Sequence, residues 1–186
     1  MNDELFTLIP ELGLFKDGAL RGKVIAAFAD ALEMGGWKPD DMAVMPFTLL
    51  IKGSPASFLD HTRRVTNTAL AITDSLEANW QGEKAMQADR DILLATALLH
   101  DVGKLLEYRR DKDGAYVKSA SGKLLRHPVS GSGLCMKWGL PDAVVHGVMY
   151  HSHEGDNARA TLEAIIVNHA DFLNFEPLVL KYGKNV

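Results

Sequence analysis

The stretch ILLATALLHDVGK, at positions 92–104, decides how this sequence is expected to fold. Its first part, 92–99, is apolar on every side of a helix, so this helix is expected to be central and buried. Asp89 and Asp91 stand just before it and favour a helix N-terminus, because carboxylates interact well with the positive end of the helix dipole. We predict a helix over residues 89–104, with His100 and Asp101 near its end.

Helical periodicity continues on both sides of this stretch. From Ser57 to Leu76, apolar residues recur at steps of three or four, and His61 lies on the same stripe. Further helices are predicted over 18–34, 127–138, 142–151 and 158–174, with a polar tail after them. The polar segment 107–123 is predicted to be a surface loop with a small hairpin at Asp113-Gly114. No alternating strand pattern accompanies these helices, so the predicted fold class is all-α.

Composition and charge narrow the range of partners. The chain has 186 residues and a formal net charge of −4, with 20 basic and 24 acidic residues, so nothing points to a nucleic-acid or anionic-membrane surface. The single cysteine, Cys135, fits a reducing compartment. The N-terminus does not resemble a signal peptide, and the apolar run at 92–99 is too short to span a bilayer. The sequence therefore predicts a cytoplasmic protein.

Histidines and aspartates occupy unusual places in this pattern. His61, His100 and His151 lie on or beside apolar stripes, and His127 opens a helix. Two carboxylates accompany them, Asp101 after the most hydrophobic helix and Asp171 inside the last one. A buried carboxylate must be paired, hydrogen-bonded or bound to a metal. A divalent metal would gather all of these groups, and mixed imidazole and carboxylate ligands suit iron, manganese, zinc or nickel.

The same residues carry a family resemblance. His61, then His100-Asp101, then Asp171 resemble the H…HD…D signature of HD-domain metal-dependent phosphohydrolases. Four local motifs occur in the order that the family shows. HDVGK at 100–104 resembles the HD-x-GK form, and HPVSG at 127–131 is similar to the H-x-x-x-G element of two-metal members. YHSHE at 150–154 is similar to the HHE element of the same members, and AD at 170–171 resembles the closing AD. The resemblance covers residues 57–174. It implies an HD-type helical bundle over residues 56–186, preceded by an extension over residues 1–55 that we expect to be helical.

The resemblance also implies roles for individual residues. The first metal would be held by His61, His100, Asp101 and Asp171. Asp101 would bridge to a second metal completed by His127 and His151, and Lys104 would meet the substrate phosphate. Asp101 and Lys104 would then be the catalytic residues of a hydrolase. Its substrate would be a phosphomonoester or phosphodiester, with a nucleotide-like compound expected, and metal-activated water would be the nucleophile.

Two departures from the family pattern leave alternatives open. Ser152 separates two histidines that the two-metal members pair, so His153 is an alternative to His151, although helical spacing from Val148 favours His151. Gly-Tyr-Pro is absent, and Gly155-Asp-Asn-Ala stands in its place, which argues against cyclic di-GMP as substrate. Lys104 also has a simpler interpretation as a cation at a helix C-terminus. The run from Glu107 to Arg110 is most often a solvated face.

Two other functions share the same motifs. A binding or signalling module would keep the fold and the metal but lack turnover, and it would bind nucleotides without hydrolysing them. A di-iron oxygenase on the same scaffold would consume oxygen, although no polyol or phosphonate signature accompanies Lys104. The sequence leaves open whether the chain self-associates.

Overall fold

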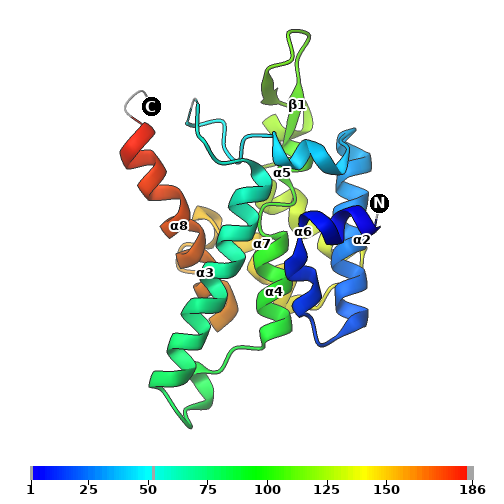
Figure 1. The fold of residues 1–186 in the computed structure, drawn as a ribbon. Helices are drawn as coiled ribbons and strands as arrows, with labels where there is room; N and C mark the ends of the chain where they lie inside the picture. The colour runs from blue at the N-terminus through cyan, green and yellow to red at the C-terminus, as the bar shows by residue number, and fades with distance from the viewer. Residues whose placement is uncertain (1, 52, 184–186) are drawn as a thin grey trace.

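A computed structural model describes residues 2–51 and 53–183, and helices dominate it (Figure 1). The α-helices are α1 (Asn2–Leu8), α2 (Gly18–Gly35), α3 (Phe58–Asn79), α4 (Arg90–Leu99), α5 (Lys104–Glu107), α6 (His127–Lys137), α7 (Asp142–Tyr150) and α8 (Leu162–Tyr182). Short 3-10 turns lie in the connections: η1 (Pro10–Leu14), η2 (Pro39–Ala43), η3 (Lys84–Met86), η4 (Ser121–Lys123) and η5 (His153–Gly155). A single antiparallel hairpin pairs β1 (Tyr108–Arg110) with β2 (Tyr116–Lys118) in the part of the chain described. The predicted all-α class is confirmed.

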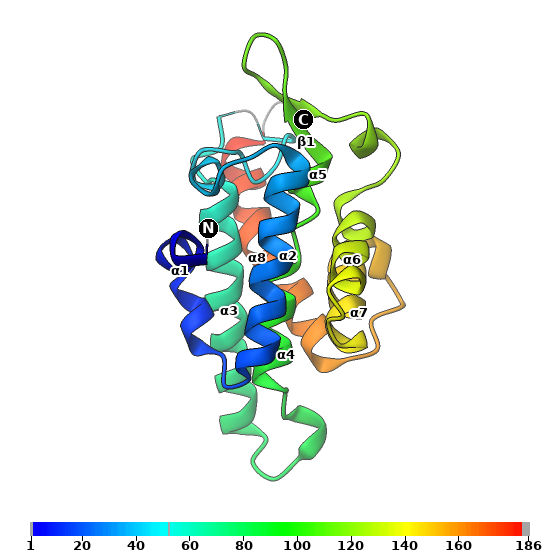
Figure 2. The ribbon, with the colours of Figure 1, turned by 90° about the vertical axis from the view of Figure 1, so that its right-hand side faces the viewer.

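Helix α4 is the element around which the others are arranged. Every residue from Leu93 to Leu99 is buried, and α4 packs against α2, α3, α7 and α8. Figure 2 shows α2, α3 and α4 running side by side, with α6 and α7 along one flank. A helix with apolar side chains on every face is stable only when neighbouring elements cover all of those faces. The central position predicted for this helix is therefore confirmed.

The C-terminal end of α4 lies earlier than predicted. The helix ends at Leu99, residues 100–103 form a turn, and Lys104 begins the separate helix α5. The prediction that one helix runs to Lys104 is wrong. The turn packs so closely against the start of α6 that a Cβ at Gly103 would collide with the carbonyl oxygen of His127. A glycine thus lets the chain turn where any other residue would hold the two segments apart.

Replacing Gly103 with alanine is expected to lower the free energy of unfolding by about 1–3 kcal/mol, because the added methyl group must push two backbone segments apart. Chemical denaturation followed by circular dichroism measures the change. Gly133→Ala is the matched control, since Gly133 lies within α6 and a Cβ there meets nothing within 4 Å. The control should gain about 0.5–1 kcal/mol from the better helix propensity of alanine. Equal stabilities for the two variants would show that the close approach at Gly103 is not restrictive.

Two other helices begin or end where their sequence indicates. Asp17 caps α2 by accepting hydrogen bonds from the backbone N–H groups of Ala19 and Leu20, and the helix ends at Gly36, whose φ is 72°. Such a left-handed residue at a helix end favours glycine. Ser57 and Asp60 form a reciprocal capping box at the start of α3. This box fixes the first turn of the helix that carries His61.

The N-terminal segment packs into the core of the helices that follow it. Leu5, Ile9 and Leu12 are fully buried in the hydrophobic cluster that also contains residues of α4. Glu11 is buried too, and its carboxylate accepts hydrogen bonds from Arg63 and Asn67 on α3. The division at residue 55 between an extension and a domain stays a prediction about folding units.

The last helix starts later and continues further than predicted. Helix α8 begins at Leu162, where Thr161 caps it, and it runs through Pro177 to Tyr182. Beyond the predicted end, Phe175, Leu178 and Val179 pack against an apolar cluster of Phe47, Ile51 and Ala56. This tertiary contact stabilises turns that the local sequence alone would leave as a tail. In the described part of the chain, no helix is both long enough and apolar enough to cross a bilayer.

Candidate metal centre

The turn after α4 delivers His100 and Asp101 to the middle of the bundle. Side chains from four other elements meet them there: His61 of α3, His127 of α6, His151 after α7, and Asp171 of α8. His61, His100, Asp101, His127 and His151 are all buried, with exposures of 8% or less. The structure thus brings together all six residues that the sequence singles out as metal ligands.

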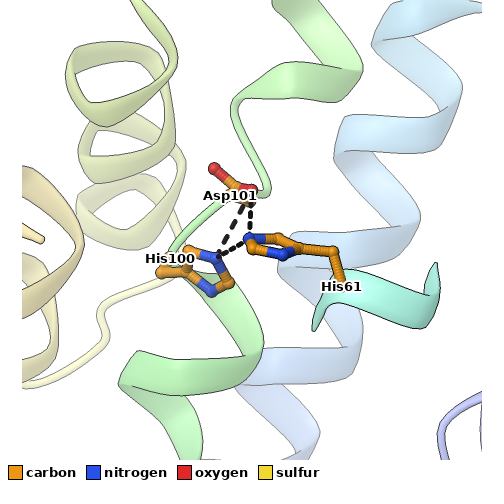
Figure 3. A group of neighbouring side chains, drawn as sticks. All are labelled: His61, His100 and Asp101. Atoms are coloured by element: carbon orange, nitrogen blue, oxygen red, sulfur yellow. Dashed lines mark hydrogen bonds and ion pairs between the residues drawn. The ribbon is translucent and has the colours of Figure 1, made fainter. Parts of the chain in front are cut away.

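The two carboxylate oxygens of Asp101 face two different pairs of histidines. Oδ2 lies 3.5 Å from Nε2 of His61 and 3.4 Å from Nε2 of His100, and Figure 3 shows this group. Oδ1 lies 3.2 Å from Nε2 of His127 and 3.7 Å from Nε2 of His151. Each group has the spacing of ligands that could hold one ion. Asp101 is the residue common to both groups.

Asp171 extends the first of these groups. Its Oδ1 lies 3.0 Å from Nε2 of His61, and its side chain is 16% exposed. The contact with His61 holds the pKa of Asp171 at about 2, although burial alone would raise it. An ionised carboxylate is therefore present on the α8 side of the His61–His100 pair.

Hydrogen bonds at the far side of two rings fix which nitrogen faces Asp101. Nδ1 of His100 lies 2.6 Å from the carbonyl oxygen of Ala97, and Nδ1 of His151 lies 2.7 Å from that of Val148. A carbonyl oxygen only accepts, so Nδ1 carries the proton in each neutral ring and Nε2 keeps its lone pair. Those lone pairs point at a carboxylate that also only accepts. A divalent cation between these groups would accept both lone pairs and contact the carboxylate, so the donor set fits divalent metals.

Burial favours the neutral, metal-binding form of two of these histidines, His61 and His151. It lowers the pKa of His151 to about 3, and the neighbouring rings of His100 and His127 add to the effect. Burial likewise lowers the pKa of His61. Neutral imidazole is the metal ligand, since the protonated ring has no lone pair to offer.

Comparison with known proteins agrees with this geometry. Residues 58–174 match the family model described as HD domain. The chain belongs to the HD-domain family, within the metal-dependent phosphohydrolase superfamily. It is also 29% identical over 169 residues to a dihydroneopterin 2′,3′-cyclic phosphate phosphodiesterase of Methanocaldococcus jannaschii. That alignment covers 84% of this chain and 63% of the relative, so the chain spans under two thirds of the relative's length. No solved structure matches the chain.

A buried glutamate supports the second histidine pair of this HD domain. Oε2 of Glu107 accepts a hydrogen bond from the backbone N–H of His127 and lies 3.0 Å from Nδ1 of the same residue. Lys118 contacts the other oxygen at 3.0 Å. Burial would raise the pKa of Glu107, but His127 and Lys118 bring it down to about 2. A carboxylate behind a histidine orients the ring and raises the basicity of its inward nitrogen.

The prediction that Glu107 lies on a solvated face is wrong. Glu107 is only 4% exposed, because α5 directs its side chain into the protein, where it contacts His127 at the start of α6. The only signal in the sequence is its place directly after the apolar pair Leu105-Leu106.

Glu107→Gln is expected to weaken metal binding at the His127–His151 pair by roughly 10- to 100-fold, since the ring loses its anionic partner. A titration of metal-free protein in competition with a chelating dye measures the affinity. Glu176→Gln makes the same chemical change at an exposed position of α8 and should leave the affinity unaltered. Wild-type affinity in Glu107→Gln would remove this residue from the site.

Lys104 contacts Asp101 rather than extending into solvent. Its Nζ lies 2.6 Å from Oδ2 of Asp101 and 2.7 Å from the carbonyl oxygen of Phe47. Burial raises the pKa of Asp101, but the Lys104 ammonium outweighs that effect and holds it well below its usual range. Lys104 is thus at the beginning of α5, and its interpretation as a C-terminal helix cation is wrong. An ammonium group has three donors, so one N–H remains for a further acceptor.

The alternatives among the histidines are separated by burial. His151 is completely buried beside Asp101, whereas the His153 side chain is 70% exposed and pairs with Asp156. His146 accepts a hydrogen bond from the backbone N–H of Ala160, and His169 is exposed. Helical spacing from Val148, which favoured His151 over His153, therefore agrees with the geometry.

A cavity of about 380 Å³ opens onto the cluster. Among the residues lining it are His61, Asp101, His127 and Asp171 together with Lys104, while Phe47, Phe172 and Phe175 line it elsewhere. Its size falls within the range of small-molecule sites. A ligand in this cavity would have direct access to both histidine pairs.

Proposed function

We propose that this protein hydrolyses a phosphodiester, specifically a cyclic phosphate of a nucleotide-like compound, at a centre of two divalent metals. The observation that carries the proposal is the position of Asp101, whose two oxygens each face a separate buried histidine pair. The similarity to a cyclic-phosphate phosphodiesterase supports the class of substrate. The cavity that opens on this carboxylate supports a small molecule rather than a polymer.

The ligands divide between two positions. His61, His100, Asp101 and Asp171 would hold the first ion. Asp101, His127 and His151 would hold the second. Imidazole and carboxylate ligands together suit iron, manganese, zinc or nickel. When bound, a pair of such ions lowers the pKa of a water molecule and neutralises charge on the phosphoryl group.

The protein's own groups have distinct tasks in the reaction. Asp101 sets the spacing of the two positions, and Glu107 fixes the orientation of the His127 ring. Lys104 holds Oδ2 of Asp101 and offers its remaining N–H to a phosphate oxygen in the same cavity. In the reaction, the water oxygen forms a bond to phosphorus and one P–O ester bond breaks. The ester oxygen that leaves takes up a proton, so opening of the ring gives one product that carries both a phosphomonoester and a free hydroxyl group.

A substrate panel tests this function. Metal-free protein is loaded with Mn²⁺, Fe²⁺ or Zn²⁺ and assayed with adenosine 2′,3′-cyclic phosphate, glycerol 1,2-cyclic phosphate and the monoester p-nitrophenyl phosphate. We expect turnover of the cyclic diesters that is lost on chelation and restored by at least one metal. Metal-loaded protein that binds nucleotides but hydrolyses none of them would instead support a binding module, and metal-dependent oxygen uptake would support an oxygenase.

A further inference from the structure

One part of the cavity wall, called the aromatic wall here, is formed by phenylalanine rings. Phe172 and Phe175 of α8 line it together with Phe47. The rings of Phe47 and Phe175 meet edge to face, with 6.1 Å between their centroids. Phe47 is fully buried, and its ring also lies 4.5 Å from that of His61. The two rings of α8 are only partly buried, so they have surface left for a ligand.

Part of this wall comes from outside the segment that matches the HD family. That segment ends at residue 174 and begins at residue 58. Phe47 precedes it, Phe175 follows it, and the two ends pack on each other through Ile51 and Val179. The metal ligands lie within the matched segment, whereas two of the three rings do not.

The charges at the cavity indicate which part of a ligand the wall receives. Lys118 and Arg126 line the cavity, but each is paired with a carboxylate, Lys118 with Glu107 at 3.0 Å and Arg126 with Glu154 at 2.9 Å. Lys104 lies beside Asp101, at the metal positions of the proposed function. The proposed function therefore directs a phosphate to this end of the cavity. The aromatic side chains offer no charge to the rest of the ligand, so an uncharged group fits there.

We propose that Phe172 and Phe175 select substrates that carry a flat heterocycle, which stacks on these rings while the phosphate lies at Asp101. This inference rests on the proposed phosphodiesterase function and names the feature of the substrate that the site distinguishes. Aromatic faces bind any planar base, because every heterocycle presents a π-face. Substitution of Phe175 gives the clearer test, because Phe172 is the direct neighbour of the proposed metal ligand Asp171.

The test compares two ligands that differ only in the base. Isothermal titration calorimetry of the Mn²⁺-loaded protein measures the affinity for adenosine 5′-monophosphate and for ribose 5-phosphate. Stacking of one base predicts that the nucleotide binds roughly 10-fold or more tightly. In Phe175→Leu, which keeps an apolar side chain, the preference should fall to about 3-fold or less, and Phe175→Tyr should retain it. Leu180→Ala, at an exposed position of α8, is the control and should keep the full preference.

The outcomes separate this inference from the proposed function. A wild-type protein that binds the nucleotide no more tightly than ribose 5-phosphate overturns the inference, and so does an unchanged preference in a folded Phe175→Leu protein. Metal-dependent hydrolysis of glycerol 1,2-cyclic phosphate, which has no planar base to stack, reports on the proposed function alone. A preference for the nucleotide without hydrolysis of any diester would support base binding by the aromatic wall and contradict the proposed hydrolase function.

Discussion

Asp101→Asn is expected to reduce phosphodiester turnover by at least about 10³-fold and to lower the metal content of the purified protein. The amide replaces one of the two anionic oxygens with an NH₂ group, which cannot bind a cation. Because each oxygen faces a different histidine pair, either orientation of the amide leaves one metal position without an oxygen ligand from residue 101. Elemental analysis and steady-state kinetics on the same preparation measure the two effects.

The matched control for Asp101→Asn is Asp142→Asn, an exposed aspartate in the first turn of α7. This variant loses the same charge and should keep wild-type metal content and rate. Circular dichroism confirms that both variants are folded. Metal content and turnover near wild type in Asp101→Asn would show that the assignment of the site is wrong.

His127→Ala should roughly halve the metal content and cut turnover by about 10²-fold or more, because His127 serves only the second ion. His61→Ala should instead disturb the first ion. Protein is loaded with excess Mn²⁺, desalted and analysed for metal per chain. The control is His153→Ala, which removes an exposed histidine just beyond His151 and should leave the metal content unchanged. If His127→Ala retains all of its metal and only the Michaelis constant rises, the residue contacts substrate rather than metal.

Much of the metal centre follows from local sequence. Apolar residues around the whole circumference of 92–99 can be buried only in the middle of a bundle, so His100 and Asp101 at its end had to lie deep inside. Helical spacing places His61 and His151 on inward stripes in the same way. The order of the motifs then supplies the remaining partners. The positions of His61, His100, Asp101 and His151 are predictable because each depends on periodicity within one segment, whereas His127 and Asp171 were implied by the family resemblance.

The parts that were not predicted depend on contacts between distant segments. Glu107 is buried by the approach of α6, which the local sequence indicates only through the preceding apolar pair Leu105-Leu106. The last turns of α8 are helical because Phe175 packs against residues near position 50, more than 100 residues earlier. Lys104 begins a helix rather than ending one because Gly103 allows a tight turn against His127. Tertiary packing of this kind leaves little trace in a local pattern.

The most direct measurement of the central claim is an anomalous-difference map from crystals of the Mn²⁺-loaded protein. A bridge by Asp101 predicts two peaks on opposite sides of its carboxylate, roughly 3.5–4 Å apart as in other two-metal sites. One peak should adjoin His61, His100 and Asp171, and the other His127 and His151. A single peak, or a pair of peaks that do not share Asp101, would contradict it.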